Sequence, residues 1–269
     1  METKNPNVAG MFYPGNKDEL ENFIKTFFDK IGEIEQNENI PKAFVCPHAG
    51  YIYSGIVAAY SYKLIASKID KISNTFIIMA PSHRAYFKGV GMLNCDFYKT
   101  PLGEVKINKT LCNELESDYG EFFSFNEFAF NEEHSLEVQL PFLQHIYKNK
   151  DFSIIPLVFG ETDSFRIGEI LLSFLKKHDT TIIVSSDLSH YEPYRIAQEI
   201  DKNTINLFLS KNIPGIIKEA NACGKGPWTS LTQIAIAKNR NTKLLKYLNS
   251  GDTAGDKDAV VGYANVVYY

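Results

Sequence analysis

The chain alternates short, continuously apolar segments with longer amphipathic segments, and this alternation limits its fold more than any other feature. The apolar runs are rich in Val, Ile and Phe and do not alternate polar with apolar residues, so they predict strands buried on both faces. Strands of this kind belong to sheets that helices cover on both sides. The predicted strands are residues 43–46, 75–80, 90–93, 153–159 and 181–185.

Helical periodicity occupies the stretches between these strands. In residues 17–31, apolar side chains recur three to four positions apart, as on one face of an amphipathic helix. Ser54 is expected to cap a helix that runs toward Ile69. The remaining predicted helices are residues 136–147, 165–177, 195–210 and 230–238.

The C-terminal part predicts a β-hairpin, with strands at 243–248 and 259–268 joined by the turn-rich residues 250–258. A β/α alternation that ends in a hairpin predicts one three-layer α/β/α domain over residues 1–269, with a central mixed sheet. Residues 96–130 are the least regular stretch and are expected to form an insertion or an excursion at the sheet edge.

Charge and apolar content exclude several classes of protein. The chain has 28 basic and 32 acidic residues, which argues against a nucleic-acid-binding protein whose whole surface is basic. No segment approaches the roughly 18–20 uninterrupted apolar residues of a membrane helix, and residues 1–14 lack the apolar core of a secretory signal. The four cysteines are scattered without a C-x-x-C pair, which is typical of a reducing compartment. We therefore expect a cytoplasmic protein with neither a membrane nor a nucleic acid as partner.

Three predicted strands are each followed directly by a histidine or by an Asp/His pair. His48 follows the first strand, His83 follows the second, and Asp187 and His190 follow the strand at 181–185. In open α/β sheets, ligands bind outside the carboxyl ends of the strands. We therefore expect these side chains to share one site.

Each of these residues also has a purely structural interpretation. The His48 imidazole could bond only to backbone within its Pro/Gly turn, and Asp187 could be a helix N-cap. If a helical turn begins at Asp187, its carboxylate and the His190 imidazole share a face. His145 and His178 follow helical segments among Lys and Gln residues and are interpreted as solvated surface groups.

Two further residues leave alternatives open. His134 could project together with Glu137, three residues on, or the acidic residues around it could only favour a helix N-terminus. Cys223 lies in a Gly/Pro-rich turn where a structural thiol would find little packing. Nearby Lys225 would favour its thiolate, the form that binds metals or attacks electrophiles. The other cysteines are expected to be small apolar core residues: Cys46, Cys95 and Cys112.

Seven short motifs, in order along nearly the whole chain, resemble those of the MEMO family. They read VAGMFYP, PHAGY, PSH, EHSLE, SDLSH, CG and VGY, at residues 8–14, 47–51, 81–83, 133–137, 186–190, 223–224 and 261–263. The resemblance implies a fold shared with class III extradiol dioxygenases, in which iron(II) binds two histidines and a glutamate. It also implies radical-SAM and AMMECR-like proteins as partners.

On this resemblance, His48 and His83 match the two histidine ligands, and Cys223 stands in the position of the carboxylate ligand. A soft thiolate in place of a hard carboxylate changes the metal preference. Beside activated oxygen it also risks oxidation, which argues against ring-cleaving dioxygenase activity. We expect a divalent metal, with iron(II) preferred and zinc or copper as alternatives.

The resemblance also implies the catalytic residues. His190 matches the acid/base histidine, and Asp187 and His134 would line the same cleft. The leading hypothesis is a metal-dependent, redox-active enzyme or enzyme subunit acting on an unknown small molecule, with His190 moving a proton and Asp187 orienting it. Two alternatives stay open: a module that binds a peptide or other ligand in this cleft without turnover, and a hydrolase whose nucleophile is Cys223, with His190 and Asp187.

Overall fold

In the computed structural model, which describes residues 1–34 and 38–269, twelve strands join one mixed sheet. Its main path runs in the order β1-β5-β6-β8-β3-β9-β2-β12-β10, with β11 paired to β12, and with β4 and β7 extending from β8. The strands are β1 Thr3–Lys4, β2 Ala43–Cys46, β3 Thr75–Pro81, β4 Val90–Met92, β5 Phe97–Thr100, β6 Gly103–Ile107, β7 Phe123–Phe125, β8 Ser153–Phe159, β9 Thr181–Ser185, β10 His190–Glu192, β11 Thr242–Asn249 and β12 Val260–Tyr268.

The centre of the sheet is parallel and fully covered. Strands β8, β3, β9 and β2 lie side by side in parallel, and β12 joins β2 in the antiparallel direction. Every residue of β2 and β9 is buried, as their apolar runs without alternation predict. The carboxyl ends of β3, β9 and β2 therefore meet at one edge of the sheet.

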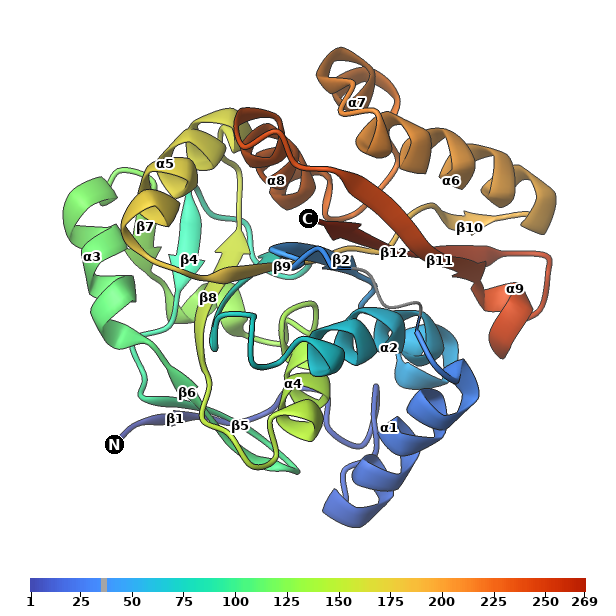
Figure 1. The fold of residues 1–269 in the computed structure, drawn as a ribbon, viewed down its shortest axis with the longest axis horizontal. Coiled ribbons are helices and arrows are strands. Elements are labelled where there is room, and N and C mark those ends of the chain that lie inside the picture. The colour runs from blue at the N-terminus through green and yellow to red at the C-terminus, as the bar shows by residue number, and fades with distance from the viewer. Residues whose placement is uncertain (35–37) are drawn as a thin grey trace.

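Helices cover both faces of this sheet. Figure 1 shows α5, α6, α7 and α8 on one side and α1, α2 and α4 on the other, so the predicted three-layer α/β/α fold is confirmed. The helices are α1 Lys17–Ile31, α2 Tyr51–Ser67, α3 Lys109–Tyr119, α4 Leu140–Ile146, α5 Ser164–Lys177, α6 Tyr194–Leu209, α7 Ile213–Glu219, α8 Lys225–Ala237 and α9 Ser250–Thr253, with 3₁₀ turns at Glu127–Phe130 and Glu137–Gln139. Within the part of the chain that the structure describes, no helix combines the length and apolar character needed to cross a bilayer.

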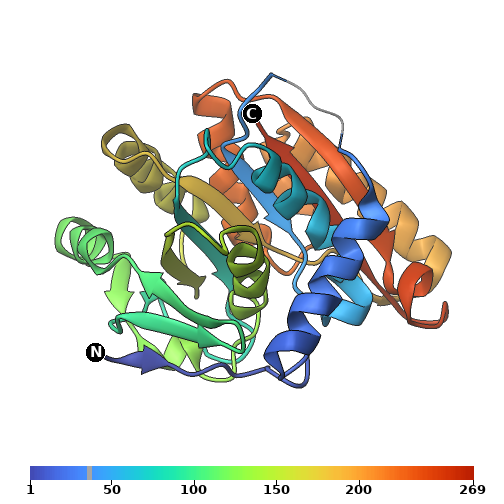
Figure 2. The ribbon, with the colours of Figure 1, turned by 60° about the horizontal axis from the view of Figure 1, so that its bottom comes forward.

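The stretch expected to be irregular is more ordered than its sequence indicates. Residues 96–130 contain β5, β6, α3, β7 and a 3₁₀ turn. The β5/β6 hairpin does lie toward the sheet edge, where β1 pairs with β5, as Figure 2 shows near the N-terminus. The predicted C-terminal hairpin is confirmed as the antiparallel pair β11/β12, although its connection holds the short helix α9.

The helix predicted at 136–147 begins only at Leu140, after a 3₁₀ turn, and two other helix starts also differ from the sequence prediction. Helix α2 begins at Tyr51 rather than after Ser54, because the Tyr51 N–H donates to Phe12 O at 2.7 Å. The Ser54 hydroxyl donates back to Ala49 O instead of capping. Helix α8 begins at Lys225, five residues earlier than predicted, since Pro227 in the first turn lacks only an N–H that has no intrahelical partner there. Both starts lie beside the sheet edge described next.

Candidate metal centre

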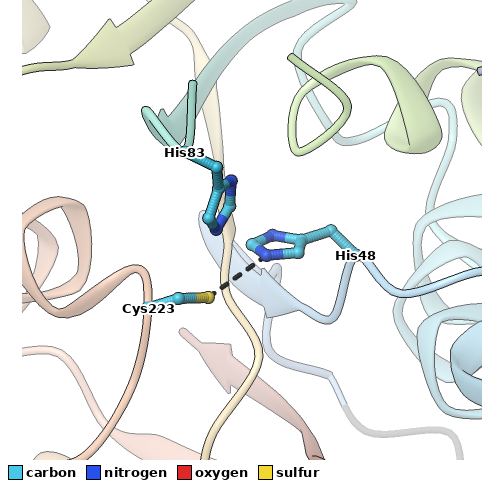
Figure 3. Close-up of side chains that lie close together, drawn as sticks. All are labelled: His48, His83 and Cys223. Carbon is cyan, nitrogen blue, oxygen red and sulfur yellow. Dashed lines mark hydrogen bonds between the residues drawn. The ribbon is translucent and has the colours of Figure 1, made fainter. Parts of the chain in front are cut away.

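Three side chains with metal-binding atoms converge at the carboxyl edge of the sheet. His48 follows β2, His83 follows β3, and Cys223 lies just before α8. One ligand atom from each lies within 4.8 Å of the other two, and Figure 3 shows the three groups pointing toward one another. Two strand ends and a helix start therefore bring two imidazoles and a thiol together.

Buried hydrogen bonds fix the tautomer of His48. Its Nδ1 lies 3.0 Å from Ser185 Oγ. That hydroxyl donates its one hydrogen to Ser135 O and accepts an N–H from Gln139, whose amide is oriented by Pro47 O. Because a hydroxyl has one hydrogen and two acceptor positions, His48 Nδ1 must itself carry a hydrogen and donate. The lone pair of His48 Nε2 is left free to bind a metal.

A buried carboxylate fixes the second imidazole. His83 Nδ1 lies 3.0 Å from Glu133 Oε1, and the His83 backbone N–H donates to Oε2 at 2.5 Å. Burial alone would raise the pKa of Glu133, but the hydrogen bonds and charge of His83, with the Ser135 amide, bring that pKa down to about 2. An ionised carboxylate only accepts, so His83 Nδ1 carries the hydrogen and Nε2 is free. Carboxylates orient metal-binding histidines in this way.

Glu133 also belongs to a second group of ligand atoms, with His83 and His134. Its Oε1 already accepts from His83 Nδ1 and from the N–H groups of His134 and Ser135, at 3.0, 3.0 and 2.9 Å. Three donors on one oxygen leave it no lone pair for a cation. We therefore assign hydrogen bonding, rather than a second metal, to this group.

The Cys223 thiol pairs with His48 and Asp187. Because His48 Nε2 bears no hydrogen, the thiol donates to it across 3.1 Å. Cys223 Sγ accepts a hydrogen bond from the Asp187 N–H at 3.2 Å, and the Cys223 N–H donates a hydrogen bond to Asp187 O. Burial, followed by the Asp187 charge, raises the pKa of the thiol. Lys225, expected to favour the thiolate, donates to Ile217 O instead, so that expectation is wrong.

Asp187 and His190 contribute separately to this edge. Asp187 Oδ1 accepts the His48 N–H at 2.7 Å, and burial nevertheless raises the pKa of Asp187 to about 7. His190 Nδ1 lies 2.8 Å from Leu188 O, so Nδ1 donates and Nε2 is free. No helical turn begins at Asp187, because His190 begins strand β10, so the shared helix face considered from the sequence does not form. Leu188 O, rather than the Asp187 carboxylate, orients the His190 ring.

These groups open into a cleft of about 660 Å³. His48, His83, Asp187 and His190 line it together with His134, so five of the six expected site residues share one cavity, and Cys223 joins them through His48. Burial lowers the pKa of His190. It also lowers the pKa of His134 to about 4, with the charges of His83 and Arg84 acting in the same direction and that of Glu133 against it. Both imidazoles are therefore neutral near pH 7.

Three supporting residues were missed by sequence reasoning: Glu133, Ser185 and Gln139. Ser185 is the last residue of β9, and Gln139 lies in the 3₁₀ turn before α4, where nothing in the sequence distinguishes them from core residues. The only sequence signal for Glu133 is its position beside His134 in the EHSLE motif.

Three other sequence interpretations are corrected by the structure. Glu137 does not project with His134, because its carboxylate accepts the Val8 N–H at 3.0 Å and anchors the N-terminal segment. His145 packs against the Phe28 ring, with centroids 5.1 Å apart. His178 bonds to Glu114 at 3.0 Å. Both outer histidines are thus half-buried rather than solvated.

The donor set fits a single metal ion. Metal–nitrogen and metal–sulfur bonds of about 2.1 and 2.3 Å in a tetrahedral site place the two donor atoms about 3.6 Å apart. The observed 3.1 Å between Cys223 Sγ and His48 Nε2 differs from this by about half an ångström. A metal here would replace the thiol hydrogen that now lies between the two atoms, and two neutral imidazoles and one thiolate would hold it.

Comparisons with known proteins agree with the motifs. A family model described as Memo-like protein matches residues 4–267. A MEMO1 family protein of Methanosarcina mazei is 38% identical over 278 residues, which cover 99% of each chain. Another, from Nitrosopumilus maritimus, is 35% identical and covers 98% of this chain and 99% of its own.

A solved structure shares the fold. An uncharacterized protein from Escherichia coli K12 superposes with a TM-score of 0.54 and covers 84% of this chain and 99% of its own. Its sequence identity is 12%, so the likeness concerns the fold alone.

Proposed function

Because this chain belongs to the Memo-like protein family, we propose that it holds one divalent metal ion through His48, His83 and Cys223 and performs redox chemistry on a small molecule. Iron(II) is the preferred ion, with zinc or copper as alternatives, since imidazole and thiolate together suit all three. When bound, iron(II) would supply one-electron chemistry and an open coordination position.

One observation carries this proposal. The Nδ1 hydrogens of His48 and His83 are both committed to buried acceptors, so that both Nε2 lone pairs are preset beside the Cys223 sulfur. Turning either ring would leave a buried acceptor unpaired, which costs about 1–3 kcal/mol. Histidines with only a packing role have no need for such an arrangement, whereas a metal site does.

The chain's own residues would then handle the proton. His190 presents a free, neutral Nε2 to the cleft, which suits removal of a proton from a bound substrate. His134, stacked on His83 with ring centroids 4.8 Å apart, would form part of the wall against which the substrate lies. Asp187 would hold the His48 loop through the His48 N–H. The proposal does not include ring cleavage, because a thiolate ligand is exposed to oxidation by activated oxygen.

The position of Cys223 favours a ligand over a nucleophile. The imidazole partner of Cys223 is His48, and among the described residues no hydrogen bond joins Cys223 to His190, so the alternative of a hydrolase lacks its nucleophile–base contact. A thiol with a raised pKa is also a weak nucleophile. Cys223 is a free thiol that forms no disulfide, which supports a reducing cytoplasm as part of the proposal. Radical-SAM and AMMECR-like partners remain proposals that follow from the family.

Metal analysis of anaerobically purified protein tests the proposal. We expect about one metal ion per chain in the wild type and a loss of most of it in His48→Ala, His83→Ala and Cys223→Ser, because three protein ligands are the minimum for a catalytic site. His178→Ala is the matched control, since it removes an imidazole bonded to a carboxylate outside the cleft. Full metal retention in both His48→Ala and His83→Ala would show that the ion binds elsewhere. Metal binding without turnover of any substrate would favour the binding module.

A further inference from the structure

Arg84 lines the metal cleft, and none of the residues that the structure describes pairs with its charge. It follows His83 directly, is exposed, and lines both this cavity and a neighbouring one beside Asn131 and Glu132. Among residues 1–34 and 38–269, its guanidinium makes no hydrogen bond or ion pair, whereas Arg166 pairs with Glu169 at 2.9 Å. An arginine carries five donors in a planar fork, so an unpaired one beside a ligand site is available to bind a ligand.

The backbone that carries Arg84 is held in place. The Ser82 hydroxyl donates to Ala85 O at 2.7 Å and accepts the Ala85 N–H at 3.2 Å, which closes the turn around Arg84. The preceding His83 N–H donates to Glu133 at 2.5 Å. The backbone of Arg84 at the rim of the cleft is therefore fixed on both sides, and only the side chain is left to adjust.

The rest of the cleft wall combines aromatic rings with small residues. Phe12, Tyr53 and Tyr191 line it, and Asp256 lies in the loop between α9 and β12. Asp256 accepts the Asp258 N–H at 3.0 Å and makes no ion pair with Arg84. A volume of about 660 Å³ lies within the usual range for small-molecule sites. The cleft thus suits a molecule with an apolar body and one anionic group.

The anion that fits is a carboxylate rather than a phosphate. Phosphate sites use several backbone N–H groups, often at a helix N-terminus. Here the N-terminus of α2 borders the cleft, but the Tyr51 and Tyr53 amides donate to Phe12 O and Gly50 O, at 2.7 and 2.8 Å. The His48 amide donates to Asp187. With these three amides already donating, the planar guanidinium is the group at this wall that matches the two oxygens of a carboxylate.

We propose that Arg84 binds the carboxylate of the substrate, which is therefore a small organic acid with an apolar body. The proposal rests on the proposed function, because it places the rest of the acid against the metal ligands. Arg84 fixes the orientation of the acid, and the apolar body lies between the aromatic walls.

Calorimetric titration of protein stripped of metal tests this, with benzoate, benzamide and phenyl phosphate as probes. We expect benzoate to bind at least about tenfold more tightly than benzamide, and Arg84→Gln to remove that preference. Arg84→Lys keeps the charge but loses the paired hydrogen bonds, so it should restore only part of the preference. Arg166→Gln is the matched control, since it removes an arginine that pairs with Glu169 and does not line the cleft, so the benzoate preference should remain.

Three results would overturn the proposal: equal binding of benzoate and benzamide, a preference that survives in Arg84→Gln, or tighter binding of phenyl phosphate than of benzoate. Absence of benzoate binding up to about 10 mM would count equally against it. Metal content separates this test from that of the proposed function, because Arg84→Gln should keep the wild-type metal content. If the metal variants fail while the benzoate preference depends on Arg84, only the metal assignment falls.

Discussion

Replacing Glu133 by Gln tests whether the buried carboxylate holds His83 in its metal-binding orientation. The substitution keeps the size of the side chain but removes its charge. Oε1 can still accept its three hydrogens, whereas an NH₂ group then faces the His83 N–H that Oε2 now accepts at 2.5 Å. Two donors would face each other in a site where Glu133 is 2% exposed.

The size of the effect follows from the pKa of Glu133. Lowering that pKa from 4.5 to about 2 in the folded state corresponds to about 3 kcal/mol of stability at neutral pH. Since the folded pKa is depressed, this stability is present above pH 4.5 and is lost as the pH falls toward 2. Between pH 7 and pH 3.5, the free energy of unfolding of the wild type should fall by about 1 kcal/mol through Glu133 alone, and Glu133→Gln should lack this decrease.

Urea unfolding of metal-free protein at pH 7 and pH 3.5 measures this difference, and metal titration at pH 7 measures the second effect. We expect Glu133→Gln to weaken metal binding by about 10–100-fold, because the new NH₂ group repels the His83 backbone N–H and a neutral amide holds the His83 ring less strongly than a carboxylate does. Glu114→Gln is the matched control, since Glu114 bonds to His178 at a partly exposed site. It should change stability by less than about 1 kcal/mol and leave metal binding unchanged. Wild-type metal affinity in Glu133→Gln, or an equal loss of stability at pH 3.5 in both proteins, would refute the reasoning.

Three further predictions concern the same edge of the sheet. His190→Ala should keep the metal but lower turnover of an identified substrate by at least about a hundredfold; wild-type turnover would exclude His190 as the proton acceptor. Gly262→Ala should destabilise the fold by about 3 kcal/mol in urea unfolding, because its Cβ would lie 2.0 Å from Asp201 Oδ2, and a loss below about 1 kcal/mol would contradict this packing. Metal binding at pH 7 should release about one proton per ion, since the Cys223 thiol has a raised pKa and must ionise; calorimetry in buffers of different ionisation enthalpy measures it, and zero release would show that the thiol stays protonated.

The strand-end placement of the histidines made much of this site predictable from sequence. Parallel neighbours in the sheet end at the same edge, so His48 and His83 had to meet once their strands were recognised. The Glu133 contact could not be anticipated in this way, because it depends on how the segment before α4 packs across the end of β3. The role of Ser185 could not be predicted either, since its position in a buried strand indicates packing rather than a hydrogen bond to His48.

The predicted start of α2 was wrong for a related reason. Ser54 has the side chain of an N-cap, but the first turn of α2 is bonded to Phe12 O, from a distant part of the sequence. The predicted stabilisation of the Cys223 thiolate by Lys225 was wrong, because proximity in sequence does not set the direction of a side chain. The Lys225 ammonium group donates to Ile217 O in α7. Local patterns thus predicted the central strands, the C-terminal hairpin and the shared edge, whereas contacts between distant segments determined the details of the site.

Cobalt(II) substitution tests the central claim most directly, because its absorption reports both the ligands and the geometry of the site. Metal-free protein titrated with Co²⁺ under anaerobic conditions should bind one ion per chain and develop a thiolate-to-cobalt charge-transfer band in the near ultraviolet, as a site with a bound cysteine thiolate requires. Cys223→Ser should lose this band, and Cys112→Ser, which changes a buried thiol outside the cluster, should keep it. A wild-type protein that binds Co²⁺ without the band, or a band that persists in Cys223→Ser, would contradict the assignment of Cys223 as a metal ligand.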